Sequence, residues 1–139
     1  MLRARPFASA DALLSQADEI WSHLEKPDYL EAFRHHPEIG ENLAELRSKF
    51  ARTAELSLGE QAGVTTASEA TLLALRHGNQ AYRERFGYSF IVCASGKSAS
   101  EMLALLEQRL PNTADSELGL AAAEQAKITH LRLEKLAAP

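Results

Sequence analysis

Apolar residues recur every three or four positions through most of this chain. That spacing places their side chains on one face of an α-helix. The first such stretch is expected to open at Ser9 or Asp11 and to be broken by Pro27. The same spacing continues further along, at residues 28–33, 41–50, 66–86, 98–110 and 115–136. The pattern therefore predicts an all-α fold.

Local signals predict where some of these helices begin and end. Thr66–Glu69 and Ser98–Glu101 have the capping-box spacing, in which a hydroxyl and a carboxylate each accept a backbone N–H that has no partner within the helix. Gly87 is suited to ending the helix before it, because glycine adopts the left-handed conformation of a helix cap.

One run, Phe90–Ala94, is continuously apolar and resembles a strand. A single strand cannot form a sheet, so we expect an extended connector whose backbone groups need other partners. The chain shows no internal repeat and no interdomain linker. The sequence therefore predicts one domain over residues 1–139, a compact bundle of about six to eight helices with one extended connector.

Composition and charge narrow the class of protein. The 139 residues are 45% apolar and carry a net charge of −4, which is ordinary for a globular domain. An acidic chain has no general attraction for nucleic acid or for an anionic membrane. Cys93 is the only cysteine, so no internal disulfide can form, and its apolar surroundings predict a buried, inert thiol. No secretory signal is evident, and a cytoplasmic protein is the simplest expectation.

Common cofactor motifs, such as glycine-rich nucleotide loops, Cys-x-x-Cys and His-Glu-x-x-His, are missing from the sequence. The five histidines lack helical ligand spacing, so no metal site is expected. His36 is the first candidate for chemistry, because Pro37 disfavours a helical conformation there and an imidazole transfers protons near neutral pH. A histidine in a surface loop would show the same local pattern.

Further polar positions could hold a substrate. Ser57, Glu60 and Gln61 lie at an expected helix start, where the spacing of Ser57 and Glu60 is itself a capping box. A capped helix start is also a rigid platform for a functional carboxylate, so the two interpretations are compatible. Arg132 lies at the edge of the apolar face of the last helix, where its guanidinium could bind a carboxylate or urea-type oxygen, or be solvated.

The order of these signals along the chain is more specific than any one of them. The segments concerned are His36-Pro37-Glu38-Ile39-Gly40, Ser57-x-x-Glu60-Gln61-Ala62-Gly63, Asn79-x-x-Tyr82-x-x-x-Phe86-Gly87-x-x-Phe90 and Lys127-Ile128-x-x-Leu131-Arg132-Leu133. In this order they resemble the motifs of the 2-oxo-4-hydroxy-4-carboxy-5-ureidoimidazoline (OHCU) decarboxylases. The likeness extends from Phe7 to Leu136.

This resemblance implies a carboxy-lyase of urate degradation. Such an enzyme is a helical homodimer that removes the carboxylate of its ureidoimidazoline substrate as CO2, gives (S)-allantoin, and uses no metal or organic cofactor. By the same resemblance, His36 and Glu60 are expected to be catalytic. The expected substrate-binding residues are Pro37, Ser57, Gln61, Phe90, Ile91, Val92 and Arg132, and the backbone of the Phe90–Val92 run would bind the ureido arm.

Two other interpretations fit the helical pattern. The chain could be a non-catalytic helical module that binds a partner or a second copy of itself, or a paralogue that acts on another ureide-like substrate. A hydrolase using His36 as a base is a weaker alternative, since no activated nucleophile is evident. An enzyme would bring His36, Glu60 and Arg132 into one polar pocket, whereas a binding module would leave them scattered.

Overall fold

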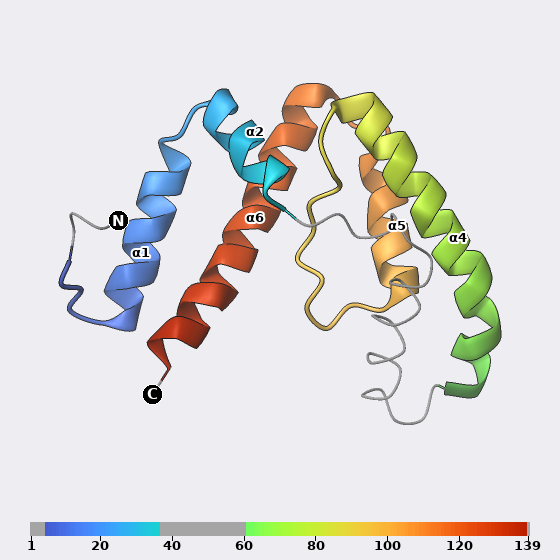
Figure 1. Cartoon of the computed structure of the whole chain (residues 1–139), viewed down its shortest axis with the longest axis horizontal. Helices are drawn as coiled ribbons and strands as arrows, with labels where there is room; N and C mark the ends of the chain where they lie inside the picture. Colours follow the sequence, from blue (N-terminus) through green and yellow to red (C-terminus); the bar gives the residue numbers. More distant parts are fainter. Residues whose placement is uncertain (1–4, 37–60, 139) are drawn as a thin grey trace.

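A computed structural model describes residues 5–36 and 61–138 of the chain, and these residues form five α-helices and no β-strand (Figure 1). The predicted all-α class is therefore confirmed. The five helices of the described residues are fewer than the six to eight expected. The helix expected at residues 41–50 lies outside the described part of the chain.

Two helices form the N-terminal part. Helix α1 (Ala10–Ser22) begins after Ser9, whose hydroxyl accepts a hydrogen bond from the Ala12 backbone N–H at 3.1 Å, so the expected start is confirmed. Helix α2 (Lys26–Arg34) corrects the expected role of Pro27. This proline does not break α1 but lies in the first turn of α2, where its missing N–H would have no helical partner in any case.

Helix α4 (Gln61–Phe86) begins five residues before the predicted start, so Thr66 lies inside it and not at its N-terminus. A capping-box pattern marks a place where a helix can start, but nothing between Gln61 and Thr66 forces a break. Gly63 alone costs about 1 kcal/mol in a helix interior. The predicted end is confirmed, because Gly87 has a positive φ of 83° and its N–H bonds to the Arg83 carbonyl.

An extended connector follows, as expected, and leads to helices α5 (Ala99–Arg109) and α6 (Ala114–Ala137). Ser98 caps α5 by accepting the Glu101 backbone N–H at 3.2 Å, which confirms the predicted start of that helix. Cys93 is buried, as predicted. No helix in the described ranges combines the length and apolar character needed to cross a bilayer.

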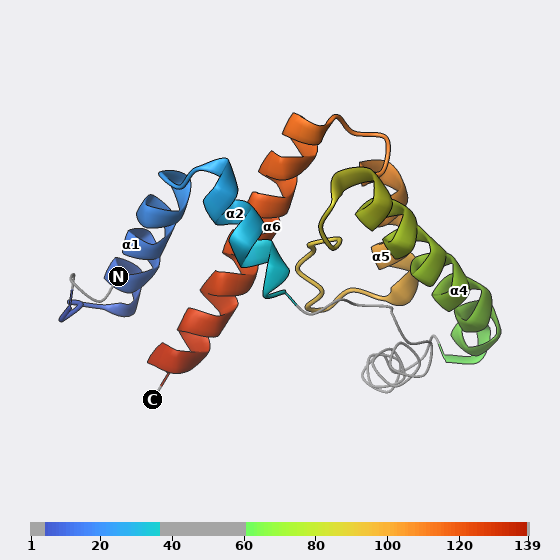
Figure 2. The same ribbon diagram turned by 45° about the horizontal axis from the view of Figure 1, so that its top comes forward.

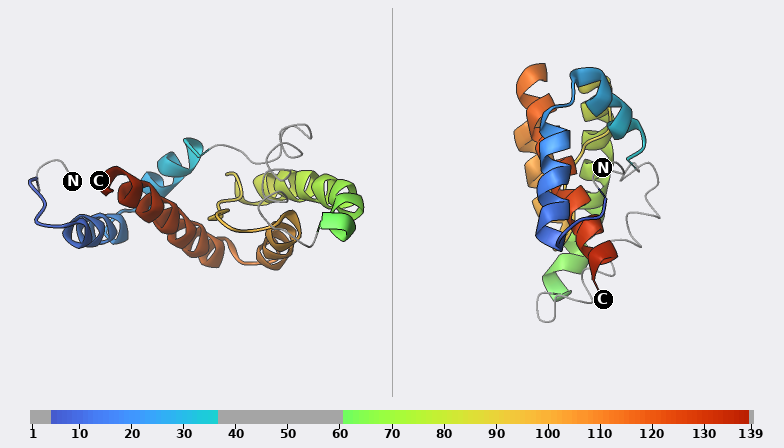
Figure 3. Two further views of the ribbon diagram at one scale, coloured as in Figure 1. Left: turned by 90° about the horizontal axis from the view of Figure 1, so that it is seen from below. Right: turned by 90° about the vertical axis from the view of Figure 1, so that its left-hand side faces the viewer.

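The helices associate in two pairs at opposite ends of an elongated molecule (Figures 2 and 3). Helix α4 packs on α5, and α1 packs on α6. The connector runs between the two pairs, and α2 crosses α6 near it (Figure 1). The hydrophobic core gathers around the connector, and its buried members are Phe33, Leu72, Leu75, Tyr82, Tyr88, Phe90, Ile91, Val92, Met102, Leu106 and Ala121.

Candidate functional site

A cavity of about 440 Å³ lies where the ends of α2 and α4 meet the start of the connector. His36, the predicted catalytic histidine, lines it. The His36 backbone N–H donates to the Phe33 carbonyl at 3.1 Å, which ties the imidazole-bearing residue to the last turn of α2. The other described lining residues are Leu30, Phe33, Arg34, Arg83, Gly87, Tyr88 and Ser89.

The charged side chains among the described lining residues of this cavity are cationic. Arg34 and Arg83 contribute guanidinium groups, and none of the described lining residues is acidic. Tyr88 is buried against Phe33, and burial raises the pKa of its hydroxyl above the usual range, so the group stays protonated at neutral pH. Such a lining is suited to a small anion and would favour a carboxylate over a cationic ligand.

The connector presents buried backbone next to this region. Phe90, Ile91 and Val92 are each 4% exposed or less, yet in the described part of the chain none of their backbone N–H groups donates a hydrogen bond. Two backbone carbonyls of the connector accept hydrogen bonds from cationic side chains. Arg109 Nη1 donates to the Ile91 carbonyl at 2.6 Å, and Lys97 Nζ donates to the Cys93 carbonyl at 2.6 Å. A buried N–H without an acceptor is costly, so a bound ligand would stabilise this segment.

Arg109 also belongs to a buried polar network that links the connector to α4 and α6. Arg109 Nε donates to Glu117 Oε1 at 2.7 Å, and Nη2 lies 2.5 Å from the same oxygen. The Tyr82 hydroxyl donates to Glu117 Oε1, and Asn112 Nδ2 donates to Oε2 at 3.1 Å. Burial, and then the bond to Glu117, raise the pKa of Tyr82 far above its usual range.

Sequence reasoning missed this network, although one signal was available. Glu117, Ala121 and Gln125 are spaced by four residues on α6, and all three are buried. A glutamate in the first turn of a helix is ordinarily explained by favourable interaction with the helix dipole. Its position on the same stripe as two core residues could have indicated a buried carboxylate, which requires a paired cation.

The remaining predicted site residues are placed as follows. Pro37, Ser57 and Glu60 lie outside the described residues, and Gln61 is the first residue of α4. Arg132 is exposed on α6 and does not line the cavity that contains His36. Of the three residues expected to converge, the described structure therefore brings His36 to a polar cavity and leaves Arg132 outside it.

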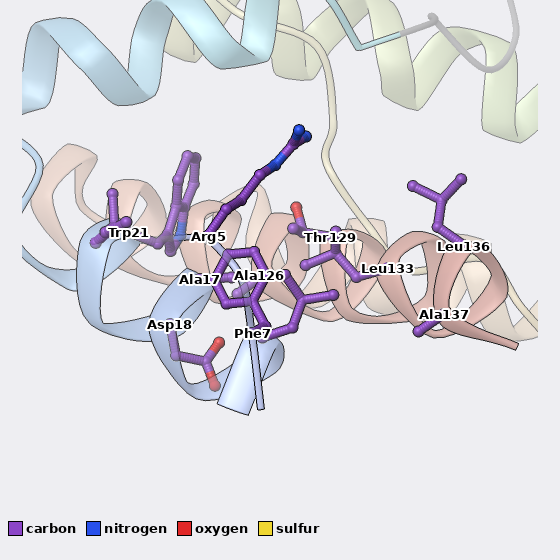
Figure 4. A pocket seen from close by; sticks show the side chains of 12 residues that line it. Arg5, Phe7, Ala17, Asp18, Trp21, Ala126, Thr129, Leu133, Leu136 and Ala137 are labelled. Atoms are coloured by element: carbon purple, nitrogen blue, oxygen red, sulfur yellow. The ribbon is translucent and has the colours of Figure 1, made fainter. Parts of the chain in front are cut away.

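A larger cavity of about 600 Å³ lies between α1 and α6 and has a mostly apolar lining (Figure 4). Trp21, Phe7 and Leu133 contribute to it, and the charged groups at its edge are Arg5 and Asp18. None of the predicted site residues lines it.

Among the residues that the structure describes, no group of three or more histidine, cysteine or acidic side chains is arranged to hold a metal ion. The His36 cavity is therefore the better candidate site.

Comparison with known proteins adds an independent result. Residues 1–134 match the family model described as OHCU decarboxylase. The chain belongs to the OHCU decarboxylase family. It shares 39% identity over 138 residues with the uric acid degradation bifunctional protein TTL of Arabidopsis thaliana, covering 98% of this chain and 42% of that protein. It shares 34% identity over 135 residues with the 2-oxo-4-hydroxy-4-carboxy-5-ureidoimidazoline decarboxylase of Amia calva, covering 95% of this chain and 74% of the relative.

Two solved structures have the same fold as this chain. A crystal structure of OHCU decarboxylase in the presence of (S)-allantoin superimposes with a TM-score of 0.76 at 33% identity, covering 99% of this chain and 87% of the other. A structure of (S)-allantoin synthase superimposes with a TM-score of 0.68 at 22% identity, covering 94% of this chain and 39% of the other. The second likeness extends the common fold to a longer protein, of which this OHCU decarboxylase family member spans less than half.

Proposed function

We propose that this chain is a carboxy-lyase that converts 2-oxo-4-hydroxy-4-carboxy-5-ureidoimidazoline to (S)-allantoin and CO2 in urate degradation. The match of residues 1–134 to the OHCU decarboxylase family is the observation that carries this proposal. The cationic cavity beside His36 supports it, because the substrate is a small carboxylate. Helical binding modules have no need of such a cavity.

The substrate's own chemistry explains how a protein without an electron-sink cofactor could catalyse this step. The carbon that loses CO2 also bears a hydroxyl and adjoins a ring C=N bond. Electrons from the breaking C–C bond flow into that C=N, as they would into the ring of a bound electron-sink cofactor. The protein then has to orient the carboxylate, manage the hydroxyl proton and deliver one proton to a single face of the ring.

Residue roles follow from this requirement, as part of the proposal. His36 and Glu60 form the acid–base pair near the hydroxyl and the departing carboxylate. Pro37, Ser57 and Gln61 hold the ring in one orientation, which fixes the face that is protonated. Arg132 is not included, because it is exposed and does not line the His36 cavity. The N–H groups of the Phe90–Val92 segment, which have no acceptor among the described residues, bind the ureido arm, whose carbonyl oxygen is a suitable acceptor.

The proposal extends to assembly and location. We infer a homodimer, as the family resemblance implies. A cytoplasmic location agrees with a single buried cysteine, since disulfides are rare in that compartment. Sedimentation velocity over a range of protein concentrations tests the dimer.

The decisive experiment generates the unstable substrate from urate with urate oxidase and the ring hydrolase, adds this protein, and follows the circular dichroism of the allantoin formed. Rapid appearance of the (S)-allantoin signal is expected. Slow formation of racemic product, as in a control without this protein, would contradict the decarboxylase assignment if far-ultraviolet circular dichroism shows a folded helical protein. In that case a paralogue acting on another ureide becomes the first alternative, and a binding module the second.

A further inference from the structure

The connector between α4 and α5 would be a poor ligand-binding element without support. It forms no β-ladder in the described structure, and it contains no regular hydrogen bonding of its own. An extended segment of this kind is free to rotate its peptide planes unless other groups fix them. The two cationic contacts to the Ile91 and Cys93 carbonyls are the groups that do so here.

The contact to Ile91 determines the direction of a specific donor. A trans peptide is planar, and its C=O and N–H point in opposite directions. Arg109 Nη1 holds the Ile91 carbonyl at 2.6 Å. The Val92 N–H, in the same peptide plane, is thereby aimed away from the buried guanidinium. Val92 is 1% exposed, and this N–H has no partner within the described residues.

Arg109 is itself held rigidly. The Glu117 carboxylate is fully buried and contacts two nitrogens of the Arg109 guanidinium. Tyr82 and Asn112 donate hydrogen bonds to the same carboxylate. The guanidinium also lies 4.5 Å from the centroid of the Phe90 ring, so Arg109 contacts the connector through both a side chain and a carbonyl. A buried ion pair of this kind is weak evidence of a role in stability, since an apolar replacement of similar volume is often equally stable.

We propose that Arg109, fixed by Glu117, is a positioning residue that orients the Ile91–Val92 peptide so that the Val92 N–H binds the substrate. The proposal rests on the assignment of the Phe90–Val92 backbone to the ureido arm. Arg109 touches no reacting atom, and its effect is exerted through the peptide. The arm is attached to the ring carbon next to the one that loses CO2, but no bond within the arm forms or breaks in that step, so its binding is expected to contribute about equally to the ground state and the transition state.

The test compares Arg109→Lys with Arg85→Lys in the coupled urate assay. Both replacements keep the positive charge, and both remove a guanidinium that donates to a backbone carbonyl, because Arg85 Nη2 donates to the Asn112 carbonyl at 2.9 Å. A lysine cannot reproduce the fork that serves Glu117 and Ile91 together. Arg109→Lys is expected to raise KM by about 3- to 10-fold with little change in kcat, as loss of one oriented hydrogen bond would do. Arg85→Lys is expected to match the wild type.

The outcomes separate this proposal from the assigned activity. An inactive but folded wild-type protein contradicts the decarboxylase assignment, and the positioning role with it. An active wild type with an unchanged KM in a folded Arg109→Lys variant overturns the positioning role alone. A fall in kcat and in thermal midpoint without a rise in KM also overturns it, because that result is expected of a purely structural ion pair.

A measurement on the wild-type protein keeps the proposal testable if Arg109→Lys does not fold. The backbone amide resonance of Val92 is followed by ¹⁵N–¹H nuclear magnetic resonance while (S)-allantoin is added. A saturable shift of the Val92 amide, larger than that of Ala99 at the start of α5, is expected. An unmoved Val92 resonance, with saturable shifts at other residues, would overturn the proposal.

Discussion

His36 and His35 are adjacent histidines with different surroundings. His36 lines the cationic cavity, whereas His35 is the exposed C-cap of α2. We predict that His36→Ala lowers kcat by about 100- to 10,000-fold, the usual contribution of a general acid or base, with the helical circular dichroism unchanged. His35→Ala is the matched control and is expected to retain wild-type kcat. Equal losses in the two variants would contradict the assignment of His36.

Tyr82 predicts how stability depends on alkaline pH. Burial and the bond to Glu117 raise its pKa above the ordinary value of 10.0, so the folded state keeps a proton that the unfolded chain releases. This contribution to stability is fully present below about pH 10 and is lost as the pH rises further, at about 1.4 kcal/mol per pH unit. Urea unfolding of the wild type between about pH 8 and pH 11 measures the slope.

Tyr82→Phe provides the comparison. It removes the titrating hydroxyl, so the alkaline fall in the free energy of unfolding is expected to be shallower than in the wild type. The variant is also expected to be less stable at neutral pH, because Glu117 loses a buried donor. An identical slope in the two proteins would show that another group governs the alkaline transition.

Individual residues differ in how far the sequence could foretell their roles. His36 could be singled out because Pro37 and the motif around it mark an irregular segment, and it does line a polar cavity. Arg109 could not, because its partners are a carbonyl 18 residues earlier and a carboxylate 8 residues later, and no local pattern links the three. Arg132 was expected on the edge of an apolar face and is exposed on α6, which agrees with the solvated alternative.

Helices α4 and α5 pack closely at Gly78, where the glycine leaves no room for a larger side chain. A Cβ built on Gly78 would lie 2.5 Å from Leu106 Cδ2, and Leu106 is fully buried. Gly78→Ala gains about 1 kcal/mol in helix propensity but must displace that packed side chain, which typically costs 1–3 kcal/mol. We predict a net loss of about 1 kcal/mol in the free energy of unfolding, measured with urea.

Two further variants isolate the cause. Gly119 lies in α6 with nothing within 4 Å of a Cβ built on it, so Gly119→Ala is expected to gain stability from helix propensity alone. In a Leu106→Ala background, Gly78→Ala is expected to become neutral or stabilising, because the atom it displaces is gone. Additive effects of the two changes would exclude the steric explanation.

Helix ends show which local signals are reliable. Ser9, Ser98 and Gly87 act where the sequence placed them, since a hydroxyl or a glycine at a true boundary satisfies backbone groups that have no helical partner. The boundaries predicted at Thr66 and Pro27 were wrong, because threonine is also tolerated inside a helix and proline in its first turn. Local patterns therefore indicate possible boundaries, and packing selects among them.

At the scale of the whole molecule, the sequence predicted helices and a connector but not which helices pair. An apolar stripe indicates that one face of a helix is buried, but it does not indicate which helix packs against that face. Long-range bonds that contribute to this arrangement include Trp21 Nε1 to the Ala122 carbonyl at 2.9 Å and His130 to Asp18 at 2.5 Å. Both join α1 to α6, and neither has a signature in the spacing of residues.

The position of Trp21 also gives the protein an internal optical reporter. It is the only tryptophan of the chain, and it lies where α1 meets α6, a helix pair in which α1 contributes no fully buried residue. The α4–α5 pair carries five of the eleven buried core residues in the described part of the chain and contains only tyrosine and phenylalanine as fluorophores. Because α1 is held mainly by half-buried contacts, we predict that tryptophan emission shifts to the red at a lower urea concentration than the loss of far-ultraviolet ellipticity. Coincident transitions would instead show that the two ends of the molecule unfold as one cooperative unit.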